Sequence, residues 1–211
     1  MYGKPKVIPV EEVLPFEKPE SPYGHSKQIG EQIIKAGVES GMCLKAMSLR
    51  YFNIIGAHHS GLIGEKSVRL EKNFVPLMIE ATIKNRGKLV VTGRDHKTQD
   101  GTCIRDYTHV MDIAEAHVRY LEHLYEQKEK KIYDSINLGT GRGHSVMEMI
   151  EKFQEVTGRK VRYIIGPHRA GDIDAIYANV KKAKKVLGWK AQRSIEEGLK
   201  QSWIWQKNMM N

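Results

Sequence analysis

The chain has 211 residues, which is enough for one sizeable domain or two small ones and excludes a peptide hormone or a disulfide-stapled miniprotein. Hydrophobic residues make up 40% and charged residues 28%, which excludes a disordered chain, a fibrous repeat and a membrane bundle. Lys and Arg number 34 against 25 Asp and Glu, and the net charge of +9 suits nucleic acid, an anionic membrane or a phosphate-bearing substrate. Charge alone does not choose among these three.

The cysteines and the hydropathy of the chain indicate its compartment. Cys43 and Cys103 have no partner spacing typical of a zinc site or a disulfide framework, so we expect a reducing environment. No apolar run of signal-peptide length opens the chain, and no segment approaches the roughly 20 apolar residues of a membrane span. We therefore expect a soluble, cytoplasmic protein with no membrane partner.

Helix and strand signals alternate through the first half of the chain. Ser21 and Pro22 are typical of a helix start, with Ser at the cap and Pro at the first helical position. The apolar stripe of this helix is formed by Ile29, Ile33, Ile34 and Val38. Further patterns predict a buried strand at 44–52, a helix at 74–84 and a short strand at 89–91.

The same alternation continues in the second half. Apolar residues at steps of three and four predict a helix from Val110 to Tyr125, with Thr108 or His109 as its cap. A strand at 132–138 is followed by a helix that Ser145 caps. A strand at 161–165 and two helices, around 186–187 and over 195–205, complete the chain. Strands that alternate with helices predict an α/β protein with a largely parallel sheet.

A glycine-rich turn that seats the pyrophosphate of a dinucleotide is missing from this pattern. No G-x-G-x-x-G occurs, and the nearest segment, Gly139-x-Gly141-x-Gly143, lacks the required spacing and the downstream acid. We therefore expect that this chain alone does not bind a dinucleotide in the usual way.

Tyr23 and Lys27 are candidates for acid-base chemistry. Their i, i+4 spacing places a phenol and an ammonium on one face of the first turns of a helix. A nearby cation and the positive end of the helix dipole both favour the phenolate, whose ordinary pKa of about 10 is too high for a base at neutral pH. An ordinary surface pair is the competing interpretation, and it is the commoner one for an isolated Y-x-x-x-K.

Later segments add groups that suit a diphosphate. A buried strand leads into a glycine-containing loop over 49–61, a place where open α/β sheets bind ligands. Arg105 with Tyr107, and Arg169 near Asp172, supply two guanidinium groups that each could hold a phosphate bidentately. Taken singly, each arginine reads as a structural ion pair.

Other polar clusters favour plain interpretations. His58 and His59 lack accompanying carboxylate or cysteine spacing, so they predict a polar loop and no metal site. The lysine groups at 128–131 and 181–185 have no interleaved aromatic residues, so they indicate solvated surface and no nucleic-acid partner.

Four segments in order, 23–27, 49–61, 100–112 and 169–172, resemble the UDP-glucose 4-epimerase family of extended short-chain dehydrogenase/reductases. The resemblance runs from Tyr2-Gly3 to the Trp203-x-Trp205-Gln206 tail and so covers essentially the whole chain. Its most specific part is the motif that begins at Arg105 and ends at Val110.

The resemblance implies a truncated Rossmann-like, doubly wound parallel sheet plus a smaller α/β sugar-nucleotide-binding domain. Residues 1–53 and 105–138 would be the remnant of the NAD-binding domain, and 54–104 with 139–211 would form the UDP-sugar-binding domain. The family's glycine-rich turn and its catalytic Ser or Thr fall before Met1. We therefore expect the carboxy-terminal part of an epimerase, with an incomplete NAD site and an exposed apolar edge on the strand at 44–52.

The resemblance also implies catalytic roles. Tyr23 would take the proton of the sugar 4-hydroxyl while hydride passes to NAD, and Lys27 would hold the nicotinamide ribose and lower the pKa of Tyr23. Rotation of the 4-keto sugar and return of the hydride would interconvert UDP-glucose and UDP-galactose, a step of galactose metabolism. Tyr51 and Phe52 would line the nicotinamide end of the cofactor.

Substrate-binding roles carry over in the same way. Arg105 and Arg169 would grip the diphosphate, with Asp172 on the uridine ribose. Thr92 stands where the family places an aromatic residue against the uracil, which could weaken that contact by about 1 kcal/mol. The full set implied for the sugar nucleotide is Asn53, Asn73, Phe74, Val90, Thr92, Arg105, Tyr107, Arg169, Asp172 and Ile176.

Alternatives remain open at this point. Ile176 falls where the family varies in bulk beside the sugar, which leaves N-acetylated substrates open. Family members commonly pair through cofactor-domain helices, including the one that starts at Pro22, which leaves a homodimer open. The chain could also be an inactive fragment or a UDP-sugar-binding module. A sister dehydratase or decarboxylase is disfavoured by the loop at 50–61.

Overall fold

The computed structural model describes residues 1–42, 45–66, 73–83, 87–169 and 171–210. Its helices are α1 (Pro22–Ser40), α2 (Phe74–Ile83), α3 (Val110–Glu126), α4 (Val146–Thr157), α5 (Lys181–Leu187) and α6 (Ile195–Met210). Its strands are β1 (Lys45–Tyr51), β2 (Asn53–Ile55), β3 (Leu89–Thr92), β4 (Ile104–His109), β5 (Ile132–Leu138), β6 (Gly143–Ser145), β7 (Tyr163–Gly166) and β8 (Ala175–Ile176).

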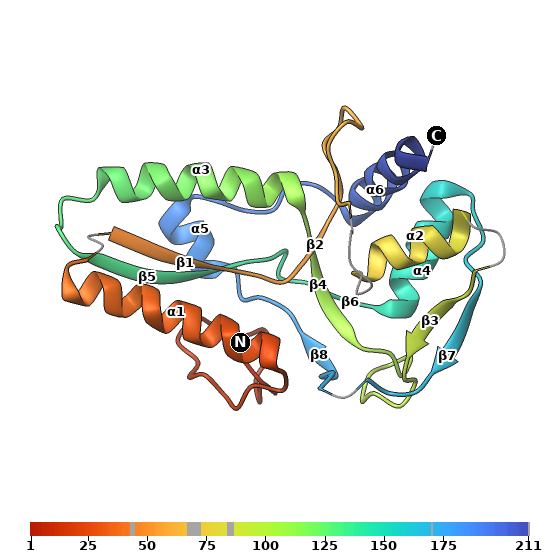
Figure 1. The fold of residues 1–211 in the computed structure, drawn as a ribbon, viewed down its shortest axis with the longest axis horizontal. Coiled ribbons are helices and arrows are strands. Elements are labelled where there is room, and N and C mark those ends of the chain that lie inside the picture. Colours follow the sequence, from red (N-terminus) through yellow and green to blue (C-terminus); the bar gives the residue numbers. More distant parts are fainter. Residues whose placement is uncertain (43–44, 67–72, 84–86, 170, 211) are drawn as a thin grey trace.

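The molecule is elongated, with two lobes joined through β2 and β4 (Figure 1). In one lobe β1 and β5 pair in parallel between α1 and α3, and in the other α2, α4 and α6 pack near the parallel pair of β3 and β7. Between the lobes, β4 pairs in parallel with β2 and β8 and antiparallel with β6. Parallel pairing dominates, so the predicted α/β class with parallel strands is confirmed.

Local capping explains where the predicted helices begin and end. The Ser21 hydroxyl accepts a hydrogen bond from the Gly24 N–H at 3.1 Å, and Gly41 closes α1 in the left-handed region at φ 84°. Ser145 caps α4 as predicted, in a reciprocal capping box with Glu148. Of the two candidates for α3, His109 is the cap, because its ring accepts a hydrogen bond from a backbone N–H of the first turn.

The apolar stripe predicted for α1 does not face a core. Ile29, Ile33 and Ile34 are exposed, and of that stripe only Val38 is buried. The helix turns its Gln28 and Glu31 side to the sheet because the Glu31 carboxylate pairs there with a buried guanidinium. An ion pair therefore decides which face of α1 is buried, and helical periodicity alone could not show it.

That guanidinium belongs to Arg50 of β1, and it joins three separate segments of the chain. Arg50 and Glu31 are each 7% exposed, and the Nε of Arg50 donates to the carboxylate at 2.9 Å. A second nitrogen of Arg50 donates at 2.8 Å to the hydroxyl of Tyr2, which donates in turn to the amide oxygen of Asn137 at 2.5 Å. The rings of Tyr2 and Phe16 lie 5.1 and 5.5 Å from the guanidinium carbon. The amino-terminal segment is thereby fixed onto the sheet.

Each lobe has its own hydrophobic core. One core is built from β1, β5, α3 and α5, and the other from β2, β3, β4, α2, α4 and α6. Ala183, Leu187 and Trp189, in and just after α5, belong to the first core. The division expected from the resemblance placed them in the second domain, so the packing of these side chains differs from that division.

The predicted strands and helices shift slightly at their ends. The predicted strand at 161–165 is observed as β7, from Tyr163 to Gly166, while Val161 is buried in the second core. Leu44, Lys84 and Cys43 lie outside the described residues, and Cys103 is a buried free thiol. None of the helices in the described part of the chain is both long and apolar enough to span a bilayer.

Replacing Glu31 by Gln tests the buried ion pair. The change leaves the Arg50 charge buried without its partner, so we expect the free energy of unfolding to fall by about 3 kcal/mol. Glu39→Gln is the matched control, because Glu39 is exposed and lies 3.8 Å from Lys35, and it should cost less than about 0.5 kcal/mol. Urea unfolding followed by circular dichroism measures both, and equal losses would contradict the assignment.

Candidate functional site

Tyr23 and Lys27 lie together at the start of α1. The Lys27 ammonium is 5.1 Å from the centre of the Tyr23 ring, so the predicted phenol and ammonium share one face of the helix. Tyr23 is 72% exposed, and the Ser26 hydroxyl donates to the Tyr23 carbonyl oxygen. The pair is accessible to a ligand from solvent.

Tyr51 ends β1 and is held by a histidine of α3. The Nδ1–H of His117 donates to the Ile113 carbonyl oxygen at 2.8 Å, since a carbonyl oxygen can only accept. Nε2 is then the acceptor for the Tyr51 hydroxyl, also at 2.8 Å, in the neutral ring. Burial raises the pKa of Tyr51, and Phe52 follows it, half-buried. The sequence pattern predicted the helix that carries His117 but gave no role to this histidine.

Four of the predicted substrate-binding residues come together where the two lobes meet. An Nη atom of Arg105 lies 3.7 Å from one carboxylate oxygen of Asp172, and the Thr92 hydroxyl donates to the other at 3.4 Å. Ile176 is the register partner of Arg105 between β8 and β4. We call Thr92, Arg105, Asp172 and Ile176 the polar cluster, although Ile176 contributes only its aliphatic surface.

The guanidinium of Arg105 is held in place by the backbone. It donates to the carbonyl oxygens of Ile104 and Ile173 at 2.8 and 2.7 Å. Arg169 is exposed at the start of a turn in which the Asp172 N–H donates to its carbonyl oxygen at 3.1 Å. Arg105 is therefore pre-ordered beside Asp172, whereas Arg169 reaches solvent.

Asp106, the residue after Arg105, has a buried carboxylate that holds two backbone segments in place. It accepts from the Thr140 N–H and hydroxyl at 2.8 and 2.7 Å, from the Gly141 N–H at 3.1 Å and from the Ala178 N–H at 3.2 Å. A Cβ on Gly139 would lie 2.5 Å from the same carboxylate. The Gly-Thr-Gly segment is thus a turn held by Asp106, and the backbone N–H groups of Thr140 and Gly141 already donate to that carboxylate.

Other predicted residues lie in the core or on a loop. Tyr107 is buried, its ring centre is 6.5 Å from that of Phe74, and burial raises its pKa, so its side chain is closed to a ligand in this structure. Asn53 is its register partner at the start of β2. The exposed Asn73 side chain donates from its amide to the Glu65 carboxylate at 2.7 Å.

A cavity of about 480 Å³ adjoins Asp172, between the amino-terminal segment and the segment at 168–175. Three lysines that sequence reasoning missed contribute to its wall beside two carboxylates. The sequence could not predict that Lys4 and Lys6 line this cavity, because only the folding of the chain brings them close to Asp172. The lining residues are Lys4, Pro5, Lys6, Ile8, Lys97, His168, Asp172, Ile173, Asp174 and Ala175.

Two further histidines flank this cavity. The rings of His96 and His168 have centres 4.4 Å apart and are tilted by 35° to each other. His96 bonds Asp174 through Nδ1 at 3.0 Å, and His168 bonds Asp95 through Nδ1 at 3.2 Å. Both contacts lower the pKa of the carboxyl groups, chiefly through these hydrogen bonds.

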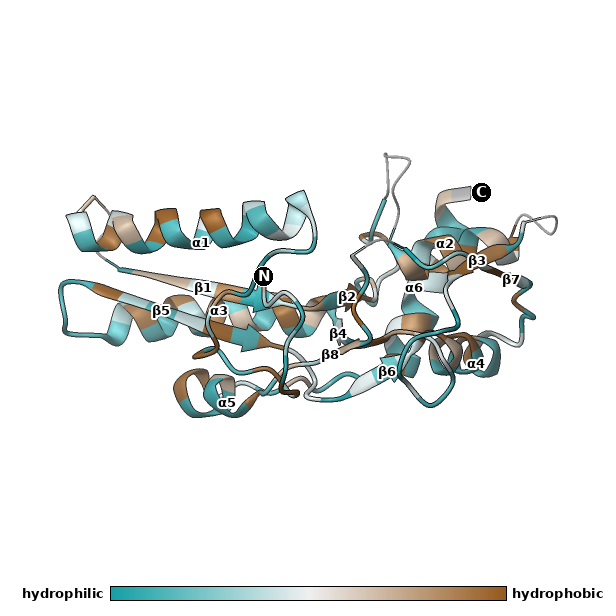
Figure 2. Ribbon diagram, turned by 90° about the horizontal axis from the view of Figure 1, so that it is seen from below, coloured by the Kyte–Doolittle hydropathy of each residue, from teal (hydrophilic) through white to brown (hydrophobic). Residues whose placement is uncertain are grey.

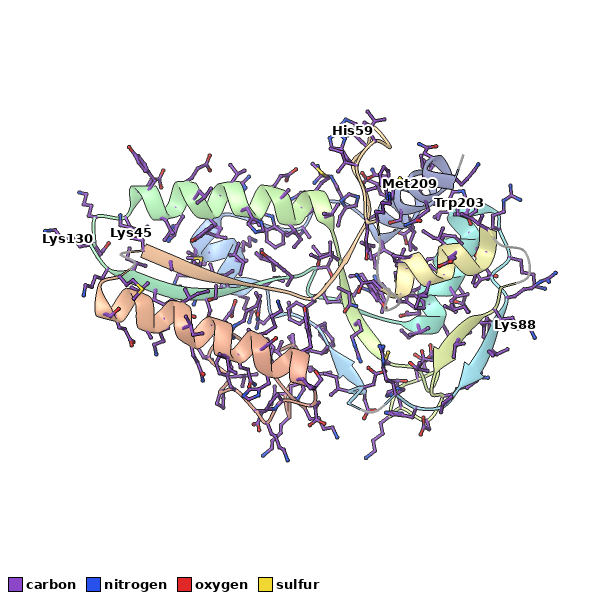
Figure 3. The ribbon with its side chains drawn as sticks, in the orientation of Figure 1. Lys45, His59, Lys88, Lys130, Trp203 and Met209 are labelled. Atoms are coloured by element: carbon purple, nitrogen blue, oxygen red, sulfur yellow. The ribbon has the colours of Figure 1, made fainter. Side chains whose placement is uncertain are left out.

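Metal binding finds no support within the described ranges. No three His, Cys, Asp or Glu side chains there lie close enough to hold an ion. The rings of His58 and His59 have centres 4.1 Å apart and are tilted by 38°, and His59 lies on the loop that projects from the molecule after β2 (Figure 3).

Comparison with known proteins assigns the chain to a family of nucleotide-sugar enzymes. The family model described as GDP-mannose 4,6 dehydratase matches residues 1–202. The chain therefore belongs to this NAD-dependent epimerase/dehydratase family, and within it to the UDP-glucose 4-epimerase family.

Individual relatives agree with that assignment. The chain is 41% identical to the UDP-glucose 4-epimerase of Drosophila melanogaster and 40% identical to that of Bacillus subtilis, in each case over 100% of its own length. It superimposes on the UDP-glucose 4-epimerase of Bifidobacterium longum, solved with NAD+ and UDP, with a TM-score of 0.93 and 39% identity. The chain spans 60%, 61% and 62% of these three relatives.

Asp106→Asn tests the carboxylate that positions the turn at 139–141. An amide offers one acceptor atom and points an N–H at the other donors, so we expect a loss of about 3 kcal/mol in the free energy of unfolding. Glu122→Gln on the exposed face of α3 is the control and should change stability by less than about 0.5 kcal/mol. Thermal and urea unfolding measure both, and a neutral Asp106→Asn would contradict this role.

Proposed function

We propose that this chain is the sugar-nucleotide-binding part of a UDP-glucose 4-epimerase, the enzyme that interconverts UDP-glucose and UDP-galactose through a 4-keto sugar with NAD. The observation that carries the proposal is the polar cluster, in which Arg105 stands pre-ordered beside Asp172 and Thr92. Support also comes from the family membership and from the UDP bound to the Bifidobacterium longum relative.

The binding roles follow from charge and geometry. Arg105 and Arg169 would hold the diphosphate, because a guanidinium presents two parallel donors to phosphate oxygens. Asp172 would accept hydrogen bonds from ribose hydroxyls. Lys4 and Lys6 in the adjoining cavity raise the local positive potential, which attracts an anionic ligand.

The catalytic role falls to the pair at the start of α1. Tyr23 would remove the proton of the sugar 4-hydroxyl, and the Lys27 ammonium would favour the phenolate that this requires. NAD, when bound, supplies the hydride acceptor. Tyr51, oriented by His117, would face the nicotinamide end, with Phe52 next to it.

The described residues fit only one end of NAD. Tyr23, Lys27 and Tyr51 suit the nicotinamide ribose end. The Gly-Thr-Gly turn cannot cradle the pyrophosphate, because its N–H groups at Thr140 and Gly141 are held by Asp106. This favours a second candidate function, a UDP-sugar-binding module without turnover when the chain acts by itself.

Calorimetric titration of the 211-residue chain with UDP-glucose, and separately with NAD, tests the binding proposal. We expect UDP-glucose to bind and NAD to give no saturable heat. Arg105→Gln should weaken UDP-glucose binding by about 30-fold, because a charged contact to phosphate is lost. Arg119→Gln, on the exposed face of α3, is the control and should bind normally. Absence of UDP-glucose binding to the folded chain would overturn the proposal.

Turnover distinguishes the enzyme from the module. We expect no conversion of UDP-galactose to UDP-glucose by the purified chain with added NAD, because the sequence contains no G-x-G-x-x-G turn to seat the pyrophosphate of NAD. A coupled assay for UDP-glucose measures this. Robust turnover that disappears in Tyr23→Phe would contradict the module and establish the enzyme.

A further inference from the structure

The cavity that adjoins Asp172, which we call the lysine cavity, lies between two segments that hold each other in place. On one side of it the Val10 N–H donates to the Tyr177 carbonyl oxygen at 2.9 Å. On the other side a Cβ on Gly171 would lie 2.7 Å from the Glu20 carbonyl oxygen, so a glycine is needed for this close approach. The amino-terminal segment runs beside β8 in two perpendicular views (Figure 1 and Figure 2). The walls of the cavity are therefore part of the folded structure.

The lysine cavity is separate from the polar cluster, although Asp172 belongs to both. Ile176 of the polar cluster is the register partner of Arg105. Successive side chains of a strand point to opposite faces, so Ala175, which lines the cavity, lies on the other face of β8. Neither Thr92 nor Arg105 lines the cavity. A ligand in the lysine cavity would therefore occupy a different space from the diphosphate proposed at Arg105.

Both carboxylates in the wall of the lysine cavity already have partners in the protein. An Nη atom of Arg105 lies 3.7 Å from a carboxylate oxygen of Asp172. The Asp174 carboxylate accepts a hydrogen bond from Nδ1 of His96 at 3.0 Å and another from the backbone N–H of Lys97. These groups stabilise the two negative charges, so the carboxylates do not depend on the lysine ammonium groups for partners.

The lysine ammonium groups, by contrast, have few partners. Lys4 lies 3.7 Å from Glu20 in an exposed pair, which holds an ammonium only weakly. In the part of the chain that the structure describes, Lys6 and Lys97 form no ion pair. Three ammonium groups around one cavity attract an anion, and they attract one with two charges more strongly than one with a single charge.

The composition of the wall indicates which class of anion fits. A phosphate monoester carries about −1.5 to −2 charges at neutral pH, more than a carboxylate or a sulfate ester, and lysine is a common phosphate-binding residue. Ligand sites combine a few charged groups with apolar surface that covers the rest of the ligand. The apolar part of this wall is formed by Pro5, Ile8, Ile173 and Ala175.

We propose that the lysine cavity binds a phosphate monoester. Lys4, Lys6 and Lys97 hold the phosphate, and the organic part of the ester packs on Ile8 and Ile173. The site goes beyond the proposed function, because it needs no nucleotide at the polar cluster and it would be present in a chain without turnover.

Calorimetric titration of the 211-residue chain at one pH and one ionic strength tests this with n-butyl phosphate, n-butyl sulfate and inorganic phosphate. We expect n-butyl phosphate to bind at one site and the other two to bind at least about ten-fold more weakly. The sulfate ester has less charge, and inorganic phosphate buries no methylene groups. Absence of n-butyl phosphate binding, or equal affinity for either of the other two anions, would overturn the inference.

Variants locate the bound ester. Lys6→Gln and Lys97→Gln should each weaken n-butyl phosphate binding by about ten-fold, because each removes a charged contact to the phosphate. Lys130→Gln is the matched control, because Lys130 lies at the far end of the lobe built on β1 and β5, and it should bind normally (Figure 3).

Arg105→Gln separates this site from the nucleotide site. It should change n-butyl phosphate affinity by less than about three-fold, whereas it weakens UDP-glucose binding by about 30-fold. A larger loss of n-butyl phosphate affinity in Arg105→Gln than in the two lysine variants would place the ester at the polar cluster and overturn the inference. Failure of UDP-glucose to bind would overturn only the proposed function.

Discussion

The buried pair of Arg50 and Glu31 is the interaction on which the arrangement of this chain depends. It binds α1 to β1, and through the Tyr2 hydroxyl it also fixes the amino-terminal segment to β5. Two buried charges carry a large desolvation cost, and the cost is offset only when every donor and acceptor is matched. That requirement fixes which side of α1 meets the sheet, and it brings Lys4 and Lys6 to the wall of the cavity beside Asp172.

Two buried aspartates extend the same principle across the molecule. Asp106 holds the turn at 139–141, and Asp112 accepts from the backbone N–H groups of Gln192 and Arg193, both at 3.0 Å. Apolar packing gives each lobe its core, but it tolerates small displacements. Carboxylates that accept several directed hydrogen bonds allow much smaller displacements. Asp106 and Asp112 therefore fix the positions of β4 and the start of α3 relative to the segments whose N–H groups they bind.

The nucleotide side and the catalytic side of the proposed site differ in how much protein surrounds them. Arg105 and Asp172 stand among β3, β4 and β8 with their partners in place. Tyr23, by contrast, is open to solvent beside Lys27. In the proposed function, the nucleotide-binding half of the site is thus the more completely formed one, and proton transfer by Tyr23 would need a surface that covers it.

Local sequence patterns were sufficient to predict the alternation of helices and strands, the caps at Ser21 and Ser145, and the shared helix face of Tyr23 and Lys27. These features depend on neighbours a few residues apart, so periodicity and capping chemistry suffice to find them. The family resemblance added candidate substrate-binding residues, but it did not predict which side chains each of them contacts.

Contacts between segments far apart in the sequence became visible only in the folded chain. Ile33, which helical periodicity places on an apolar stripe, is exposed because Glu31 on the other side of α1 pairs with Arg50 of β1. The fold also joins Thr92 to Asp172, and Tyr51 to His117. Contacts across such separations follow from the topology of the sheet and the balance of buried charge, and no local pattern encodes either of them.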